Sequence, residues 1–167
     1  EQALLRTLSG QKNFLMVGTV EPRKAHQQVL EAFEHLWRSE TSINLVIIGK
    51  KGWLVDALAQ RLQQHPQLGK RLFWLSSASD QMLESVYGVS TCLIFASEGE
   101  GFGLPLIEAA QHQLPIIVRD LPVFKEVAGM HAYYFKGSTA LELAQAIEAW
   151  SELYKQGLHP TSGAMPR

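Results

Sequence analysis

The sequence predicts an α/β fold of three layers, with about six parallel strands between two layers of helices. Two observations carry this prediction. Six short apolar runs occur along the chain, and each is continuous rather than alternating, as expected for strands that are covered on both faces. Segments with helical apolar spacing separate these runs, and such an alternation of strand and helix favours a parallel sheet.

The expected strands follow the apolar runs in chain order, at residues 14–17, 44–48, 72–75, 91–95, 115–118 and 132–135. Between them, apolar residues recur at the spacings of three and four that place them on one face of a helix. The residues with this spacing are Val29, Phe33 and Leu36, then Leu54, Leu58 and Leu62, and finally Leu143, Ile147, Trp150 and Tyr154.

The two ends of the chain and the last helix have signals of their own. Thr139, followed by Glu142 three residues later, predicts a capping box at the start of the last helix. Residues 1–8 are expected to form a short helical or linker entry. Residues 156–167 have no apolar period and are expected to form a loop.

Length and charge exclude several classes of protein. The chain has 167 residues, which suits one domain, and a formal net charge of -1. A surface for nucleic acid or for an anionic membrane needs a concentrated basic field, which this balance argues against. Cys92 is the only cysteine, so no internal disulfide forms. No run reaches the ~20 apolar residues that span a bilayer, and no signal peptide is visible. We expect a cytoplasmic domain.

The loop that follows the first expected strand carries two adjacent cations. In an open parallel sheet, ligands bind beyond the carboxyl ends of the strands. Residues 18–24 place Arg23 and Lys24 at the start of a helix, where the helix dipole is already positive. A bound anion would resolve this conflict, and a guanidinium beside an ammonium group suits a diphosphate. The alternative is two solvated surface charges.

The loop after the fourth expected strand, within residues 97–110, is rich in glycine and contains two acidic residues. Pro105 suits the first turn of a helix, so the amides of residues 101–104 would be free donors for an anion. Glu100 stands just before that turn, and Glu108 lies ~5–6 Å into the helix. Carboxylates accept hydrogen bonds from hydroxyl groups, which favours a sugar or a ribose as the partner. The alternative is an ordinary glycine-rich turn with two exposed acids.

Other sites are not predicted. Trp53, after the second expected strand, either packs near a ligand or anchors the next helix, and the second interpretation is favoured. The glycines at 99, 101 and 103 lack the spacing of a dinucleotide fingerprint and follow the wrong strand, which argues against an NAD-dependent dehydrogenase. The six histidines show no close metal-ligand spacing, so no metal is expected.

These loops resemble a known family. Residues 100–108, Glu-Gly-Phe-Gly-Leu-Pro through the second Glu, resemble the motif of two glutamates separated by seven residues in retaining glycosyltransferases of family 4. Residues 14–24 are similar to the family's phosphate loop. Residues 119–129 resemble the family's segment after the next strand. The amino-acid sequence of this segment is similar to that of bacterial O-antigen mannosyltransferases in particular. The likeness covers roughly residues 13–150 and implies a Rossmann-like domain that is one half of a two-domain GT-B enzyme.

The resemblance implies a role for each matching residue. Arg23 and Lys24 would hold the donor diphosphate, Glu100 would contact hydroxyls of the donor sugar, and these three would be the catalytic residues. Glu108 would accept hydrogen bonds from the ribose. Thr19 departs from the family, since many members carry Arg at this position. The residues expected to bind the donor are Gly18, Thr19, Arg23, Lys24, Glu100, Gly101, Phe102, Gly103, Leu104 and Glu108.

The resemblance also implies the organisation and the activity of the protein. Residues 1–167 would be a single C-terminal, nucleotide-sugar-binding domain with a core at about 13–155, incomplete at both ends, and without the N-terminal acceptor-binding domain. The expected reaction moves a hexose from a nucleotide sugar to a glycan or lipid-linked acceptor. The favoured donor is GDP-mannose, which supplies mannose, and the second candidate is a UDP-sugar. No separate cofactor is expected. The full-length protein would be cytoplasmic or peripheral to the membrane, in lipopolysaccharide or O-antigen biosynthesis. A non-catalytic module that binds a nucleotide or nucleotide sugar is the alternative.

Overall fold

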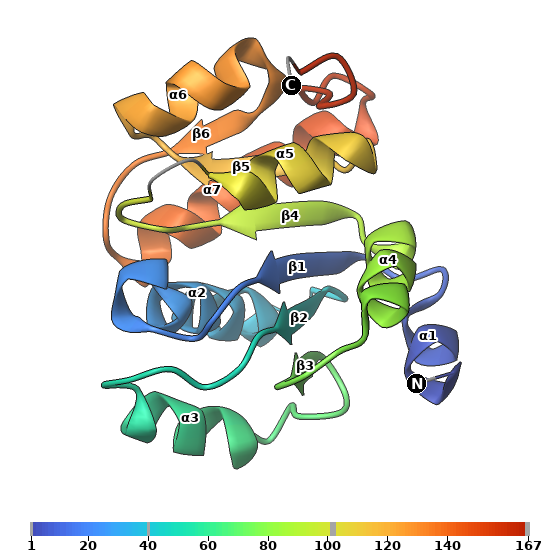
Figure 1. Ribbon diagram of the computed structural model, residues 1–167, viewed down its shortest axis with the longest axis vertical. Coiled ribbons are helices and arrows are strands. Elements are labelled where there is room, and N and C mark those ends of the chain that lie inside the picture. Colours follow the sequence, from blue (N-terminus) through green and yellow to red (C-terminus); the bar gives the residue numbers. More distant parts are fainter. Residues whose placement is uncertain (1, 40, 101–102, 166–167) are drawn as a thin grey trace.

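A computed structural model describes residues 2–39, 41–100 and 103–165, and Figure 1 shows one sheet covered by helices. All six strands are parallel and lie in the order β3-β2-β1-β4-β5-β6. The strands are β1 (Asn13–Val17), β2 (Asn44–Ile48), β3 (Leu72–Leu75), β4 (Cys92–Phe95), β5 (Ile116–Arg119) and β6 (Tyr133–Phe135). The predicted number, direction and class are confirmed, and each strand end lies within one residue of its expected position.

Seven α-helices connect and flank these strands in the described part of the chain. They are α1 (Gln2–Leu8), α2 (His26–Arg38), α3 (Asp56–Gln63), α4 (Asp80–Val89), α5 (Leu104–Gln111), α6 (Pro122–Ala128) and α7 (Ala140–Lys155). Two short 3-10 turns, Pro22–Lys24 and Gly129–His131, precede α2 and β6. None of the described helices is long and apolar enough to cross a membrane.

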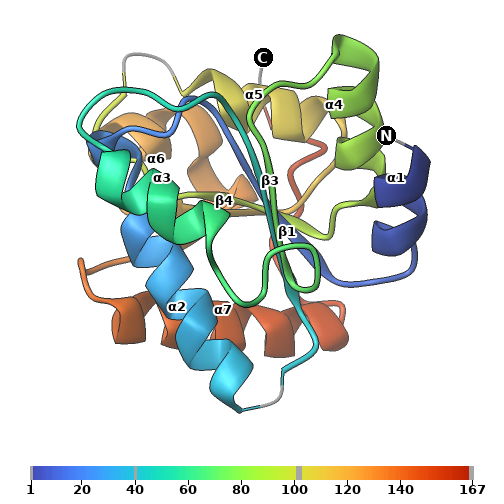
Figure 2. The same cartoon turned by 90° about the horizontal axis from the view of Figure 1, so that it is seen from below.

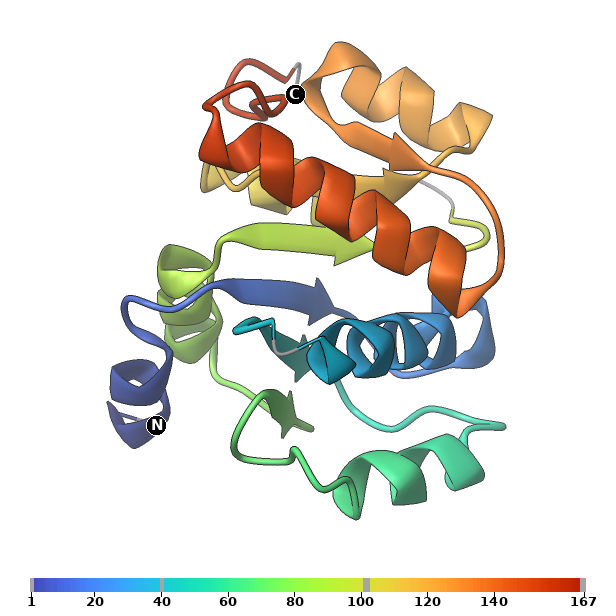
Figure 3. The same cartoon turned by 180° about the vertical axis from the view of Figure 1, so that it is seen from behind.

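Two hydrophobic cores lie on opposite faces of the sheet, which makes the fold three-layered. Side chains alternate along β1, so that Phe14 and Met16 join the core beneath α2, α3 and α7, whereas Leu15 joins the core beneath α1, α4, α5 and α6. Figures 2 and 3 show α2 and α7 side by side on one face. Both faces of the sheet are therefore closed, and only its edges and ends remain open to ligands.

The last helix begins as predicted. The Thr139 hydroxyl accepts a hydrogen bond from the Glu142 amide, and the Glu142 carboxylate accepts one from the Thr139 amide. Leu143, Ile147 and Trp150 form the buried face of α7. The first residues of the chain form α1, and the described part of the tail, residues 156–165, contains turns but no helix.

One expected helical residue was placed wrongly. Leu54 continues the spacing of Leu58 and Leu62, but it lies before α3 with a left-handed backbone (φ 57°) and is 85% exposed. The helix starts only at Asp56, after the buried Val55. A spacing of four residues defines a helix face and not the residue at which the helix starts, so the pattern extended one turn too far.

Candidate functional site

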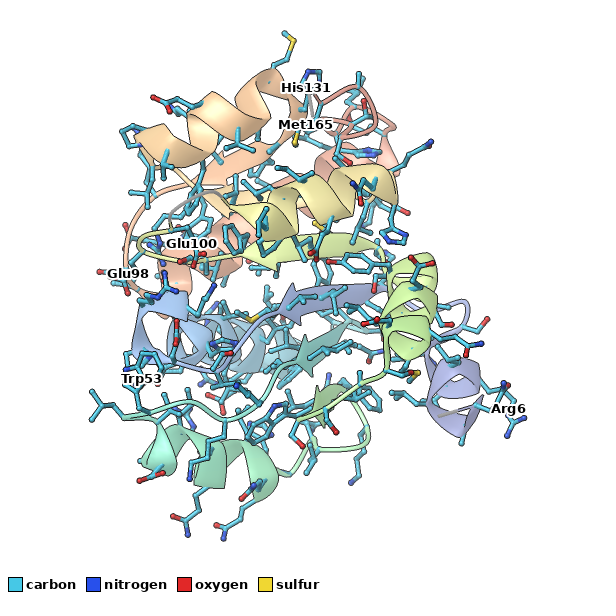
Figure 4. The ribbon with its side chains drawn as sticks, in the orientation of Figure 1. Arg6, Trp53, Glu98, Glu100, His131 and Met165 are labelled. Atoms are coloured by element: carbon cyan, nitrogen blue, oxygen red, sulfur yellow. The ribbon has the colours of Figure 1, made fainter. Side chains whose placement is uncertain are left out.

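Three loops meet where β1, β2 and β4 end. The loop after β4 is tied to the loop after β1 by a hydrogen bond of 2.8 Å from the Glu98 amide to the Arg23 carbonyl. The loop after β1 is tied to the loop after β2 by the Val20 amide, which donates to the Lys50 carbonyl over 2.9 Å. Figure 4 shows Glu98, Glu100 and Trp53 at this carboxyl edge of the sheet. The sequence-predicted loops therefore form one surface.

Glu100 joins the two predicted cations. The Lys24 ammonium lies 2.6 Å from Oε2 of Glu100, and the Arg23 guanidinium lies 3.1 Å from the same oxygen. Both Lys24 and Glu100 have side chains that are 12% exposed, whereas Arg23 is 53% exposed. Charges held this close in a partly covered position interact more strongly than on an open surface. The structure thus brings Arg23, Lys24 and Glu100 into contact, although they come from loops far apart in sequence.

Two residues that support this cluster were not singled out from the sequence. Glu21 is buried and accepts a hydrogen bond of 2.7 Å from Arg23 Nε, which fixes the guanidinium plane. Ser97 is buried, and its hydroxyl lies 2.9 Å from Glu100 Oε2. Three donors therefore converge on one oxygen of Glu100, while Oε1 has no partner in the part of the chain that the structure describes. A signal for Glu21 was its position two residues before Arg23, but Ser97 had none.

Gly18 and Thr19 lie directly beside the cluster. Gly18 has a left-handed backbone (φ 129°), and a side-chain carbon at this position would lie 3.7 Å from the Lys24 ammonium nitrogen. Its carbonyl also approaches Gly49 so closely that any side chain at position 49 would overlap it. These two glycines let the loops after β1 and β2 run in contact.

The glycine-rich turn leads into α5 as predicted. Gly103 is the residue before the helix and has a left-handed backbone (φ 67°), Leu104 is the first helical residue and is exposed, and a proline follows in the first turn. The helix therefore presents its amino end toward the carboxyl edge of the sheet. Gly101 and Phe102, whose amides are expected to face the phosphates, lie outside the described residues.

Glu108 is held by a different part of the chain. Its Oε2 accepts a hydrogen bond of 3.3 Å from the Tyr87 hydroxyl of α4, and the Tyr87 ring stacks on His112 with 4.4 Å between ring centroids. Burial, and next the charge of Glu108, raise the pKa of Tyr87 far above its usual value. Tyr87 therefore stays a hydrogen-bond donor to Glu108 at any physiological pH.

A cleft of about 590 Å³ opens beside the cluster, and Trp53 lines it. The favoured interpretation, in which Trp53 anchors the next helix, was therefore wrong. The walls of the cleft carry four cations, one carboxylate and an indole, contributed by Thr19, Glu21, Arg23, Lys24, Lys50, Lys51, Gly52 and Trp53. Trp53 is 65% exposed, so it does not anchor α3. The buried Val55 does so instead, because it immediately precedes that helix and belongs to the core.

Buried polar groups support the loops from below. The Arg119 guanidinium donates to the carbonyls of Ala96 (2.9 Å) and Gly137 (2.7 Å) and to the side chain of Gln28 (2.5 Å). Burial lowers the pKa of Arg119, and the negative charge of Glu98 opposes that shift. Arg119 thus fixes the residue that precedes Ser97.

His26 is the first residue of α2 and directly follows the loop after β1. It is 3% exposed, and its Nδ1 has no hydrogen-bond partner among the described residues. Burial, and next the charge of Lys24, lower its pKa to about 4, so the imidazole is neutral at physiological pH. No three His, Cys, Asp or Glu side chains of residues 2–39, 41–100 and 103–165 gather as metal ligands would.

Comparisons with known proteins agree with these motifs. A family model described as "Glycosyl transferases group 1" matches residues 5–160. The "Serotype-specific mannosyltransferase WbdA" of Escherichia coli is 56% identical over 161 residues, which are 96% of this chain and 20% of that protein. The "O-antigen chain mannosyltransferase B" of Escherichia coli is 32% identical over 124 residues, 73% of this chain and 32% of that protein. The chain therefore spans about a fifth of the length of the WbdA proteins it matches.

A solved structure supports the fold independently. The crystal structure of the C-terminal domain of a "Glycosyl Transferase Group 1 Family Protein (LpcC)" from Francisella tularensis superposes with a TM-score of 0.77 at 19% sequence identity. The superposition covers 92% of this chain and 82% of that domain. The architecture described above is thus the Rossmann-like α/β fold of that glycosyltransferase domain.

Proposed function

Since the chain belongs to the family of glycosyl transferases group 1, we propose that it is the donor-binding domain of a retaining glycosyltransferase. The proposed reaction moves a hexose from a nucleotide sugar to a glycan or lipid-linked acceptor bound by another domain. Mannose is the first sugar proposed, because the relatives at 56% and 32% identity are named mannosyltransferases. GDP-mannose is the proposed donor and a UDP-sugar the next, with no separate cofactor.

The contact of Lys24 and Arg23 with Glu100 carries this proposal. When the bond between the sugar and the diphosphate breaks, negative charge develops on the leaving phosphate oxygens. Lys24 and Arg23, together with the amino end of α5, stabilise that charge where it forms. The cations are already positioned by Glu21 and Glu100, so little reorganisation is needed when the donor binds.

Glu100 and Glu108 have separate roles in the proposal. Oε2 of Glu100 stays with its three donors, and Oε1 accepts a hydroxyl of the donor sugar. Glu108 accepts hydrogen bonds from the ribose and is oriented for this by Tyr87. The two carboxylates thus recognise the two sugar rings at either end of the diphosphate, which are the roles that the resemblance to the family implies.

A binding panel tests the proposal. We expect GDP to raise the melting temperature of the 167-residue chain most and UDP to raise it less, whereas NAD leaves it unchanged. A ligand at 100 times its dissociation constant adds ~2.7 kcal/mol to the free energy of unfolding, which a melting curve resolves. Lys24→Ala and Arg23→Ala should remove the shift. Lys70→Ala is the matched control, since Lys70 lines a separate cleft beside the start of β2.

Two results would contradict the proposal. One is a nucleotide-induced shift that survives both Lys24→Ala and Arg23→Ala, because the diphosphate would then bind elsewhere. The other is nucleotide binding without any transfer by the full-length protein, which would favour the non-catalytic binding module.

A further inference from the structure

The loops after β1 and β2 form the two walls of the cleft beside the cation cluster. The Gly52 amide donates a hydrogen bond of 2.9 Å to the Val20 carbonyl, and the Val20 amide donates one to the Lys50 carbonyl. A side chain on Gly52 would meet the Val20 carbonyl oxygen at 2.8 Å and the Thr19 methyl group at 2.9 Å. Backbone contacts therefore fix the two walls together, and Trp53 follows directly after the last of them.

Trp53 is exposed in a way that the other three tryptophans are not. Trp37 and Trp150 are buried in the core, and the Trp74 indole donates a hydrogen bond of 2.8 Å to a backbone carbonyl. Trp53 is 65% exposed, lines the cleft and lies at the same edge of the sheet as Glu100 (Figure 4). An indole offers a flat apolar face with one polar group at its rim, which suits a ligand that is partly apolar and partly polar.

The place of the cleft relative to the proposed donor indicates which substrate it serves. Arg23 and Lys24, which hold the diphosphate in the proposed function, both line the cleft. Glu108 and its partner Tyr87, at the ribose end of the donor, are not among the lining residues. The cleft therefore adjoins the diphosphate, on a side that the nucleoside does not occupy.

Retention of configuration determines where the acceptor reacts. The acceptor oxygen forms its bond to the anomeric carbon on the face from which the phosphate oxygen departs. In the overall exchange, the leaving diphosphate takes the bonding electron pair, and the proton of the acceptor hydroxyl passes to it. The reacting end of the acceptor must therefore lie beside the diphosphate, even when another domain binds the rest of the glycan. A cleft that shares Arg23 and Lys24 with the diphosphate meets this requirement.

The cations of the cleft leave room for an uncharged sugar, because three of the four already have an anionic partner. Arg23 and Lys24 belong to the cluster described above, and Lys51 is paired with Asp56 over 2.5 Å. Lys50 has no ion-pair partner in the described part of the chain, so its ammonium group can donate hydrogen bonds to sugar hydroxyls. The cleft thus combines an apolar face with a hydrogen-bond donor.

We propose that Trp53 is the platform for the reacting sugar ring of the acceptor glycan. The apolar C–H face of the ring lies on the indole, and Lys50 donates to its hydroxyl groups. This inference rests on the proposed function, because it assigns the place of the second substrate of the same reaction. Contact with the face of a sugar ring buries apolar surface, so Trp53 contributes affinity for the acceptor and none for the donor.

The experiment measures sugar binding and nucleotide binding separately. An α-linked mannose trisaccharide, the acceptor probe, is titrated into the 167-residue chain with and without saturating GDP, followed by protein amide chemical shifts and tryptophan emission. We expect saturable binding in both conditions, and emission that moves to shorter wavelength as the indole leaves water. Trp53→Ala should weaken the trisaccharide by about 5- to 30-fold, as loss of a central tryptophan does at binding surfaces. Its affinity for GDP, measured by calorimetry, should stay within twofold of the wild type.

Two further variants and the full-length protein sharpen the test. Trp53→Phe should restore part of the trisaccharide affinity, because a smaller aromatic face remains. Leu54→Ala is the matched control, since Leu54 is the next residue and is 85% exposed but does not line this cleft. It should leave both affinities unchanged. In the full-length protein, Trp53→Ala should raise the KM for the acceptor and leave the KM for the donor unchanged.

Three results would overturn the acceptor role. The first is a trisaccharide that does not bind the wild type, or that binds Trp53→Ala within twofold of the wild type. The second is displacement of the trisaccharide by GDP, because the cleft would then belong to the donor. The third is a Trp53→Ala variant that loses GDP and trisaccharide alike, because the indole would then act through the shape of the loop. In every case, GDP titrations of the wild type and of Lys24→Ala decide the donor site independently.

Discussion

At the start of the strands, Asn13 and Asn44 are buried, and the side-chain amide nitrogen of each donates two hydrogen bonds. Asn13 Nδ2 donates to the carbonyls of Leu8 (2.8 Å) and Val89 (2.7 Å), and its Oδ1 accepts from Asn44 over 2.8 Å. At the other end of the strands, Lys24 and Glu100 keep 12% of their side chains exposed and satisfy one another through an ion pair. One edge uses buried polar groups to hold the fold, whereas the other holds partly exposed charges that can also contact a ligand.

The difference follows from how each edge is built. Asn13 and Asn44 belong to the strands themselves, so their positions are fixed by the sheet. Lys24, Glu100 and Trp53 lie on loops, and loops held by a rigid scaffold are where binding groups concentrate. Removing a residue should therefore cost stability at the first edge and activity at the second.

The largest effect is expected for Lys24→Ala. Loss of one preorganised donor to a developing negative charge lowers the rate by ~10²–10³, measured as kcat of the full-length protein. The free energy of unfolding should change by only ~1 kcal/mol, because Glu100 keeps its contacts with Arg23 and Ser97. A variant that unfolds in much less urea but keeps its kcat would erase the contrast between the edges.

Asn13→Ala should have the opposite profile. It removes three hydrogen bonds and leaves the Val89 carbonyl without a partner among the described residues, whereas the Leu8 carbonyl and the Asn44 amide each keep one bond to Gln11. The expected loss is about 3 kcal/mol of unfolding free energy in urea titrations, since three hydrogen bonds of ~1 kcal/mol each are removed. Affinity for GDP below the melting temperature should be unchanged. A variant as stable as the wild type would show that this network contributes little.

The pH dependence of stability should sharpen the comparison, because His26 at the carboxyl edge is held neutral. Its pKa is about 4 in the folded chain and 6.5 in the unfolded chain, so the unfolded state binds more protons between these values. Stability is therefore full above pH 6.5 and falls as the pH drops toward 4, by about 2 kcal/mol at pH 5. His26→Gln should lose less stability than the wild type between pH 7 and 5, and equal losses would assign the acid sensitivity to other groups.

The smallest effect is expected for Thr139→Ala at the start of α7. It removes the side chain that accepts from the Glu142 amide and should cost ~1 kcal/mol of unfolding free energy. Thr139→Ser keeps the hydroxyl and serves as the control. Because this cap lies at the carboxyl edge but is structural, kcat should stay constant, and a large loss of kcat would link α7 to the site.

The sequence predicted the architecture well because continuous apolar runs and helical spacing are local signals. It also singled out Arg23, Lys24 and Glu100, because their loops have unusual composition, and the structure brings these three side chains into contact. It did not reveal Ser97, Arg119 or the partnership of Tyr87 with Glu108. These depend on contacts between residues far apart in the chain, such as the hydrogen bond between Arg119 and Gln28, and no local pattern marks them.

Trp53 and Leu54 show a second reason for failure. An apolar residue after a strand is usually interpreted as core, but these two side chains are exposed and Leu54 has a left-handed backbone. Whether such a residue faces the core or a cleft depends on where the neighbouring loop runs. Here the loop after β1 takes that place through its hydrogen bonds with Lys50 and Gly52.

Gly49 determines how closely the loops after β1 and β2 approach one another. Because even a methyl group there would occupy the position of the Gly18 carbonyl oxygen, the residue admits no replacement unless the two backbones separate. In a randomised library selected for transfer activity, position 49 should return glycine alone, although Gly49 is not among the residues that line the cleft. The absence of a Cβ atom at Gly49 allows the loops after β1 and β2 to lie this close together. A wider spacing would displace the side chains of one loop relative to those of the other.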